Sequence, residues 1–189
     1  MITHKGTQRM QTERLILRRF TVNDAEAMFN TWASDSRVTK YLTWTTHESA
    51  EVTKCVISEW ERSYEEKNAY NWGIEIGGKL IGSIGVVYIS EENEYAEIGY
   101  CIGYDYWNRA IMTEALSAVI AYLFKEVGFN RIELCHVSEN DASGRLAKKC
   151  GMTCEGIKRK SYKNSSGDFW DITYWSILKE EWEEKAPMQ

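Results

Sequence analysis

The stretch that decides the fold runs from Glu97 to Leu116 and reads EIGYCIGYDYWNRAIMTEAL. Its first residues belong to a predicted strand over 94–103, and its last residues begin an apolar helix that we predict over 110–127. A helix N-terminus carries unpaired N–H groups and about half a positive charge, so a compact turn before it is suited to a pyrophosphate. An ordinary strand-to-helix connection with Asn108 as its N-cap fits the same spacing.

The predicted helix over 110–127 is apolar on most of its circumference, as is usual for a helix buried against a sheet. Gly128 is expected to end it. A further strand is predicted over 131–137, and Asn140 can cap a helix over 141–150.

The remaining elements favour a mixed, mostly antiparallel sheet. Strands first, then strand–helix–strand, then a closing hairpin imply a mixed α/β sheet with helices on both faces. The Gly77–Gly78 pair suits a tight hairpin turn. The other elements are predicted as a strand within 12–20, a helix beginning at Asn23 or Asp24, a helix over 47–67, and strands over 70–76, 79–88, 153–162 and 169–178.

Length and composition indicate one globular domain. The chain has 189 residues, 43% of them hydrophobic and 27% charged, and its single proline is Pro187. We expect a flexible leader over 1–11, one domain over 12–182 and a polar tail over 183–189. The polar N-terminus and the absence of a long apolar run predict a cytoplasmic protein without a secretory signal or membrane span.

Charge and cysteine usage argue against several classes of function. The net charge is −5, and the only basic cluster is Lys158–Lys160 with Lys163, so we expect no nucleic-acid binding. A mildly acidic protein suits a cationic substrate. Five cysteines without a CxxC pair and three unclustered histidines predict no disulfide framework and no metal site. His136 is expected to be structural.

The segments 97–103 and 106–116 resemble the signature of the GNAT superfamily of acyl-CoA-dependent N-acyltransferases, and in particular its RimJ/RimL-like branch. Three further segments resemble other motifs of this branch in the same order. These segments are TERLILR at 12–18, KLIGSIG at 79–85, and Asn140–Ser143 with Leu146 and Gly151–Met152.

This resemblance implies a central sheet that splays between the strands over 94–103 and 131–137, with acetyl-CoA held in the gap. It implies that pantetheine pairs with the backbone of the first of these strands, and that Asn140 bridges strand and cofactor. The residues implied to bind the cofactor are Tyr100, Cys101, Ile102, Trp107, Asn108, Arg109, Ala110, Ile111, Met112, Thr113, Asn140 and Ser143.

The turn departs from the glycine-rich pattern of the family at Asn108, Ala110 and Met112. Asn accepts left-handed geometry, and Ala110 is expected to take helical angles, so we expect reduced but retained cofactor affinity. The alternative is a catalytically silent module that binds acyl-CoA or a protein partner.

The resemblance also suggests the residues that carry the chemistry. Glu97 matches the position of a general base, which an amine requires because it is mostly protonated at pH 7; the alternative is a surface carboxylate paired with Arg or Lys. Ser143 matches a serine that assists the departing thiolate, or else its hydroxyl caps a helix. Trp44 either lines a substrate groove or belongs to the core.

The function that we expect from the sequence is acetyl-CoA-dependent N-acetylation of a primary amine by direct transfer in a ternary complex. The acceptor is a protein N-terminus or a small amine, and Glu97 and Trp44 are its candidate contacts. The resemblance makes a homodimer plausible. We expect neither a metal nor a membrane partner.

Overall fold

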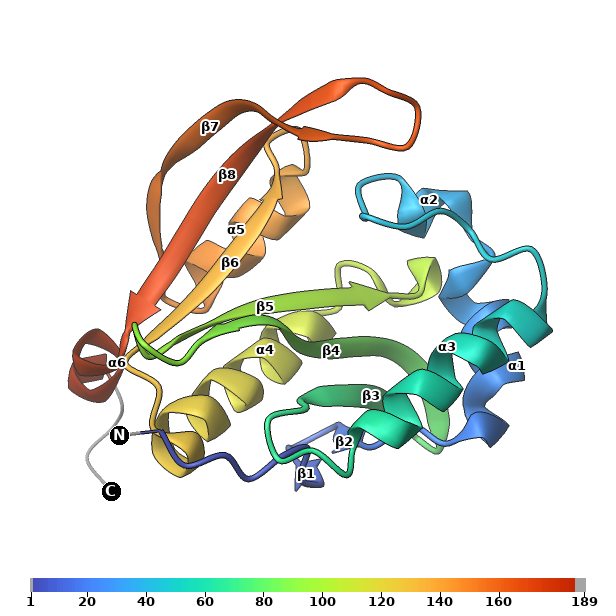
Figure 1. Ribbon diagram of the computed structural model, residues 1–189, viewed down its shortest axis with the longest axis horizontal. Coiled ribbons are helices and arrows are strands. Elements are labelled where there is room, and N and C mark those ends of the chain that lie inside the picture. The colour runs from blue at the N-terminus through green and yellow to red at the C-terminus, as the bar shows by residue number, and fades with distance from the viewer. Residues whose placement is uncertain (1, 186–189) are drawn as a thin grey trace. The chain divides into compact units, whose positions relative to one another are not determined.

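The computed structural model describes residues 2–185, which form two compact units (Figure 1). The described part of unit 1 comprises residues 2–3, 87–99 and 119–185, and unit 2 comprises 4–86 and 100–118. The strands β4 (Lys79–Ser90) and β5 (Tyr95–Ile102) contribute residues to both units. The sequence predicted a single domain over 12–182, and that boundary stays a prediction.

The strands follow the order β1-β2-β3-β4-β5-β6-β8-β7. The pairs β1/β2, β2/β3, β3/β4, β6/β8 and β7/β8 are antiparallel, whereas β5 and β6 are parallel. This confirms the predicted mixed, mostly antiparallel sheet. The bounds of the other strands are β1 (Met10–Gln11), β2 (Ile16–Arg18), β3 (Asn71–Ile76), β6 (Arg131–Val137), β7 (Thr153–Lys163) and β8 (Phe169–Leu178).

The parallel pairing of β5 with β6 is short. It joins Tyr95–Glu97 to Arg131–Glu133 at the beginning of both strands. Along its other edge β6 pairs with β8 over its whole length, from Arg131 to Val137. Strand β6 is therefore held mainly by β8.

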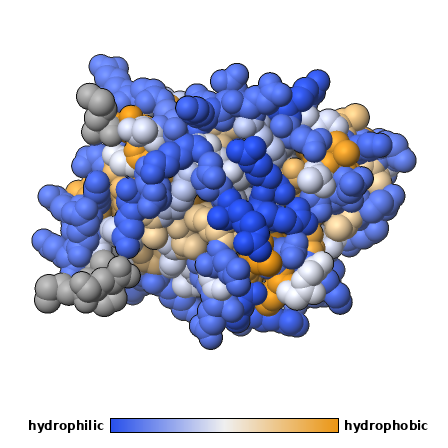
Figure 2. Space-filling model, turned by 90° about the horizontal axis from the view of Figure 1, so that it is seen from below, coloured by the Kyte–Doolittle hydropathy of each residue, from blue (hydrophilic) through white to orange (hydrophobic). Residues whose placement is uncertain are grey.

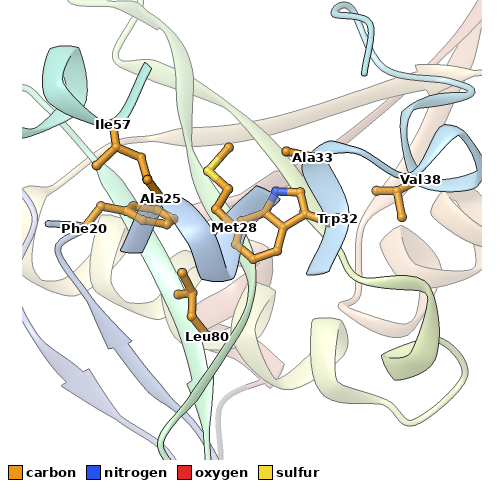
Figure 3. Packing of buried hydrophobic residues seen from close by; sticks show 8 residues of the cluster. All are labelled: Phe20, Ala25, Met28, Trp32, Ala33, Val38, Ile57 and Leu80. Atoms are coloured by element: carbon orange, nitrogen blue, oxygen red, sulfur yellow. The ribbon is translucent and has the colours of Figure 1, made fainter. Parts of the chain in front are cut away.

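In unit 2, a cluster of buried apolar side chains joins the helices to β4 (Figure 3). Trp32, Met28 and Ile57 are at most 2% exposed, and they pack with Phe20 and Leu80. The elements here are η1 (Val22–Asp24), α1 (Ala25–Met28), the π-helix η2 (Phe29–Ala33), α2 (Ser36–Thr39) and α3 (Ala50–Ser63).

Two local predictions for unit 2 have different outcomes. The hairpin turn at Gly77–Gly78 is confirmed, since both residues have positive φ, at 55° and 76°. The predicted helix over 47–67 is shorter than expected, since α3 comprises only Ala50–Ser63. The helix begins at Ala50, with Ser49 as its N-cap, and its buried face is formed by Thr53 and Ile57.

The predicted leader over 1–11 makes many contacts where it is described. Met10–Gln11 form β1. The Thr7 hydroxyl donates to the Ala69 carbonyl at 2.9 Å, and the Trp72 indole N–H donates to the Gln8 carbonyl at 2.7 Å. These bonds hold residues 7–11 within unit 2, although the apolar pattern of the sequence begins only at Leu15.

The predicted helix over 110–127 is α4 (Ile111–Tyr122) followed by a π-helical turn, η4 (Leu123–Val127). Gly128 ends it with φ at 94°, as predicted. Its buried residues lie on most of the circumference: Ile111, Met112, Ala115, Leu116, Val119, Ile120, Tyr122, Leu123, Phe124 and Val127. Among residues 2–185, no helix is both long and apolar enough to cross a membrane.

In unit 1, α5 (Asp141–Lys149) contacts β6 and β7, and α6 (Lys179–Lys185) follows β8 (Figure 1). Gly144 allows the close approach of α5, since a Cβ there would lie 3.3 Å from the His136 ring. The predicted polar tail over 183–189 begins inside α6, and its residues 186–189 lie outside the described part.

Polar residues dominate the face of the molecule that is seen from below (Figure 2). Figure 2 shows one face on which hydrophilic residues predominate and apolar ones occur in small groups. The large hydrophobic side chains that are exposed anywhere in 2–185 are Val52, Val87, Tyr88, Tyr104, Trp107, Ile157 and Phe169.

Candidate active site

The candidate site residues fall into two groups, one in each unit. Unit 2 holds Trp44, the end of β5 at Tyr100–Ile102 and the turn at Trp107–Thr113. Unit 1 holds Glu97 on β5, together with Asn140 and Ser143 at the start of α5. The residues predicted to bind the cofactor therefore occur in both units, and their roles stay a prediction.

The turn before α4 is built from backbone bonds and one tryptophan. A short 3₁₀ turn, η3 (Tyr104–Tyr106), leads from β5 to Trp107. The Trp107 indole N–H donates to the carbonyl of Ile102 at 2.9 Å, and the Tyr106 N–H donates to that of Gly103 at 3.0 Å. The indole thereby fixes the turn to the last residue of β5.

Asn108 and Ala110 both have left-handed backbones, with φ at 59° and 56°. The expectation that Ala110 takes helical angles is therefore wrong, and α4 begins only at Ile111. A left-handed residue with a Cβ costs about 1–2 kcal/mol, and asparagine tolerates this geometry better than alanine. The turn thus keeps a glycine-like conformation without glycine.

Backbone geometry makes this turn suited to an anion. When left-handed residues alternate with others, successive N–H groups converge on one side and form a concave anion site. The helix N-terminus adds N–H groups without intrahelical acceptors and a partial positive charge. Ile111 and Met112 are 2% and 8% exposed, so their side chains are buried.

An ion pair anchors this turn to the start of the chain. The Glu114 carboxylate accepts from the Arg14 Nε at 2.6 Å, the Arg14 backbone N–H at 2.9 Å and the Thr12 hydroxyl at 2.5 Å. Arg14 Nη1 also donates to the carbonyl of Arg109 at 3.1 Å. Burial alone would raise the pKa of Glu114, but the bonds from Thr12 and Arg14 outweigh it and lower the pKa. Sequence reasoning missed this anchor because its partners are about a hundred residues apart.

The end of β5 lies very close to β4 in unit 2. A Cβ on Gly82 would lie 2.5 Å from the Cys101 carbonyl oxygen, so only glycine fits there. The Gly103 N–H donates to the Ile81 carbonyl, and the Cys101 thiol contacts the Ser83 hydroxyl at 3.2 Å. Burial raises the pKa of Cys101 to about 11, so this thiol stays protonated at neutral pH.

Glu97 lies in unit 1 beside a thiol rather than a cation. The Cys135 Sγ donates to the Glu97 Oε1 at 3.0 Å. Burial and the neighbouring Glu97 raise the pKa of Cys135 to about 12. The alternative that Glu97 is a surface carboxylate paired with Arg or Lys has no support among the bonds described for residues 2–185. Its role as a base stays a prediction.

Asn140 caps α5, as predicted. Its Oδ1 accepts from the Ser143 backbone N–H at 3.4 Å. Ser143 lies in the first turn and is 9% exposed. Because the side chain of Asn140 performs the capping, the hydroxyl of Ser143 is not needed for it.

His136 is held in one tautomer by two different bonds. Its Nε2 faces the Trp175 indole N–H at 3.0 Å, and its Nδ1 faces the Val137 carbonyl at 2.8 Å. An indole only donates and a carbonyl only accepts, so the two bonds fit the tautomer with a proton on Nδ1. Both ring nitrogens have partners, as expected for a structural residue. Within residues 2–185, no group of three His, Cys, Asp or Glu side chains is arranged to hold a metal ion.

Trp44 packs partly buried against the core cluster of unit 2. Its ring centroid lies 5.2 Å from that of His47. The His47 ring in turn contacts the Thr53 hydroxyl at 2.8 Å, and burial lowers its pKa. These contacts support the alternative that Trp44 belongs to the core, for the part of its ring that is buried. A contact of Trp44 with substrate stays a prediction.

The geometry is that of an acyltransferase fold, and comparison with known proteins identifies the family. Residues 14–153 match the model of the acetyltransferase (GNAT) domain, so the chain belongs to the GNAT acetyltransferase family. It is an N-acetyltransferase.

Two curated relatives and a solved structure agree with this. The chain is 37% identical to the uncharacterized N-acetyltransferase YoaA of Bacillus subtilis, covering 90% of this chain and 96% of the relative. It is 31% identical to the putative ribosomal N-acetyltransferase YdaF of the same organism, covering 90% and 94%. A solved RimL ribosomal L7/L12 alpha-N-protein acetyltransferase in complex with coenzyme A has a similar fold, with a TM-score of 0.82 at 19% identity, covering 90% and 98%. The solved structure shows the shared fold, and the identity to YdaF supports the relationship to the RimJ/RimL-like branch.

Proposed function

We propose that the protein transfers the acetyl group of acetyl-CoA to a primary amine, directly and within a ternary complex. The observation that carries this proposal is the turn with left-handed Asn108 and Ala110 before a buried helix in a chain of the GNAT family. In this proposal the backbone N–H groups of Trp107–Thr113 bind the pyrophosphate. The end of β5, Tyr100–Ile102, pairs with pantetheine.

The proposed chemistry removes two protons from the ammonium, one before the attack and one as the amide forms, and the departing thiolate takes up the second. Glu97 accepts the proton of the ammonium, directly or through a water, so that the amine attacks the thioester carbonyl. Ser143 donates a hydrogen bond to the departing thiolate. A backbone N–H near Tyr100 stabilises the oxyanion. Placing amine and thioester together supplies a large share of the rate.

The acceptor that we favour is the α-amine of a protein N-terminus. The names of the relatives support this choice, since one is a putative ribosomal N-acetyltransferase and another a ribosomal-protein α-N-acetyltransferase. A small amine is the other candidate. We further propose a cytoplasmic location, and a homodimer in analogy with the branch.

Two measurements test the function. Acetyl-CoA at millimolar concentration is expected to raise the Tm, because a ligand that binds only the native state stabilises it. Thiol release is then followed with a panel of N-terminal peptides and small amines. A Tm shift without thiol release from any acceptor would favour the silent acyl-CoA-binding module, and no Tm shift would contradict the cofactor assignment.

Two substitutions test the roles of the side chains. Glu97→Gln is expected to lower kcat by about 10²–10³-fold at pH 7, within the range of general-base catalysis, and Ser143→Ala to lower it less. Glu92→Gln, at an exposed turn position, is the matched control and should retain the parent kcat. Turnover unchanged in Glu97→Gln would remove this carboxylate from the mechanism.

A further inference from the structure

The Tyr174 ring in unit 1 carries an ammonium group that comes from the chain itself. The Lys158 Nζ lies 4.2 Å from the centroid of the Tyr174 ring. Tyr174 is on β8 and Lys158 is on the neighbouring edge strand β7. Such a distance is within the range of a cation–π interaction.

The strand register places this ring next to the Cys135 thiol, which contacts the candidate base. Tyr174 is the Cα partner of Cys135 on β6, and cross-strand partners project their side chains to the same face. The Cys135 thiol in turn donates to Glu97. The Lys158 charge acts electrostatically on the Cys135 thiol as well, as do Glu97 and Glu133.

The edge strand carries no side chain at the position opposite the ring. The residue opposite Tyr174 on β7 is Gly156, in a strand that shifts register there. Gly156 has φ at 140°, and a Cβ built on it would meet no atom within 4 Å. Gly156, the Cα partner of Tyr174, therefore places no side chain over the ring. Lys158, two residues further along β7, contacts the ring from a diagonal position.

The charges around the ring favour a cation. Glu133 pairs with Arg131 at 2.6 Å, so its charge is balanced nearby. The bond described for Glu97 comes from a neutral thiol. The ammonium group of an acceptor would therefore find, in Glu97, a carboxylate to which no cation is bonded within residues 2–185.

We propose that Tyr174 forms a binding site for the primary alkylammonium group of the acceptor, and that Lys158 occupies this site when no acceptor is bound. The lysine side chain is itself a primary alkylammonium, so it shows which chemical class the ring accepts. Tyr174 and Lys158 then determine acceptor affinity without taking part in the chemistry. This inference rests on the proposed function for its role in turnover, but binding at the ring can be measured separately.

The binding test uses n-butylammonium chloride as the probe, followed by ¹H–¹⁵N NMR, with n-butanol and sodium chloride as controls. Shifts are expected at Cys135, Gly156 and Tyr174. Lys158→Ala removes the competing ammonium and should tighten binding by about two- to fivefold, the range of an exposed cation–π interaction. Lys163→Ala is the matched control, because it removes the same charge from the same strand and its Nζ lies 5.8 Å from a different ring, that of Phe169.

Two substitutions at the ring complete the test. Tyr174→Phe keeps the π-face and should retain binding, whereas Tyr174→Leu should lose it; thermal melting checks that both variants fold. With an acceptor that is turned over, Lys158→Ala should lower KM and leave kcat unchanged. If n-butylammonium does not shift Tyr174 in Lys158→Ala, or binds Tyr174→Leu equally well, the inference is wrong.

The outcomes separate this inference from the proposed function. Thiol release with amines but no probe binding at Tyr174 overturns the binding site and leaves the enzyme assignment intact. Probe binding at Tyr174 without thiol release supports the site and contradicts the proposed reaction.

Discussion

At the scale of single residues, Ala110 shows how a turn can keep its shape after losing its glycine. Its left-handed φ of 56° lies in a turn that is held at two points before it. Trp107 bonds back to β5, and Arg14 bonds to the carbonyl of Arg109. The sequence favoured helical angles because alanine is a strong helix former. These contacts outweigh that preference.

Replacing Ala110 by glycine should stabilise the protein. The substitution removes a left-handed strain that costs about 1 kcal/mol or more, and glycine adopts this φ freely. The unfolding free energy from urea denaturation is expected to rise by about 1 kcal/mol. Ala118→Gly, inside α4, is the control with opposite sign, since glycine in a helix interior costs about 1 kcal/mol. Equal destabilisation by both substitutions would show that Ala110 is not strained.

At the scale of elements, the N-terminus of α4 depends on a segment that precedes β2. Glu114 receives three bonds from Thr12 and Arg14, and Arg14 also holds the turn at Arg109. The position of the candidate pyrophosphate turn is thus linked to the first strands of the chain. A substitution in residues 12–14 that removes these bonds is therefore expected to lower cofactor affinity, although these residues lie about a hundred positions before α4.

Substituting Glu114 by glutamine should loosen this connection. A neutral amide accepts these bonds less strongly than a carboxylate, and the unfolding free energy should fall by about 1 kcal/mol. Acetyl-CoA affinity, measured by calorimetry, should fall with it. Glu61→Gln replaces an exposed glutamate of α3 in the same unit and should change neither quantity. Loss of stability with unchanged acetyl-CoA affinity would refute the link between Glu114 and the turn.

At the scale of the whole molecule, several native carboxylates have lowered pKa values. Burial alone would raise the pKa of Asp24, but hydrogen bonds from Arg18 outweigh it. The bonds from Arg131 lower the pKa of Glu155, and Glu114 is lowered in the same direction. Each of these groups therefore binds its proton less readily in the folded than in the unfolded chain.

The sign of the pH dependence follows from this. A carboxylate whose pKa is lowered by folding adds stability above its unfolded pKa, near 4, and loses it as the pH falls through the folded value. The urea midpoint should stay nearly constant from pH 7 to pH 5 and decline below about pH 4. High salt should reduce the decline, because these pairs are partly exposed. A midpoint that is unchanged at pH 3 would contradict the predicted ion pairs.

The sequence could predict those features that depend on residues close together along the chain. The turn at Gly77–Gly78, the helix end at Gly128 and the cap at Asn140 depend on local geometry, and all three are confirmed. The contact between Glu97 and Cys135 depends on the register of two strands whose residues are 38 positions apart. No local pattern encodes that register.

The two units are interleaved along the chain, and this has a consequence for the gene. The chain passes from unit 1 to unit 2 after Thr3, returns within β4, crosses again within β5 and returns once more within α4. No contiguous stretch of codons therefore encodes either unit, and a reading frame cut at any of the last three crossings ends inside a strand or a helix. A fusion or truncation placed at one of these three crossings would therefore divide a strand or a helix.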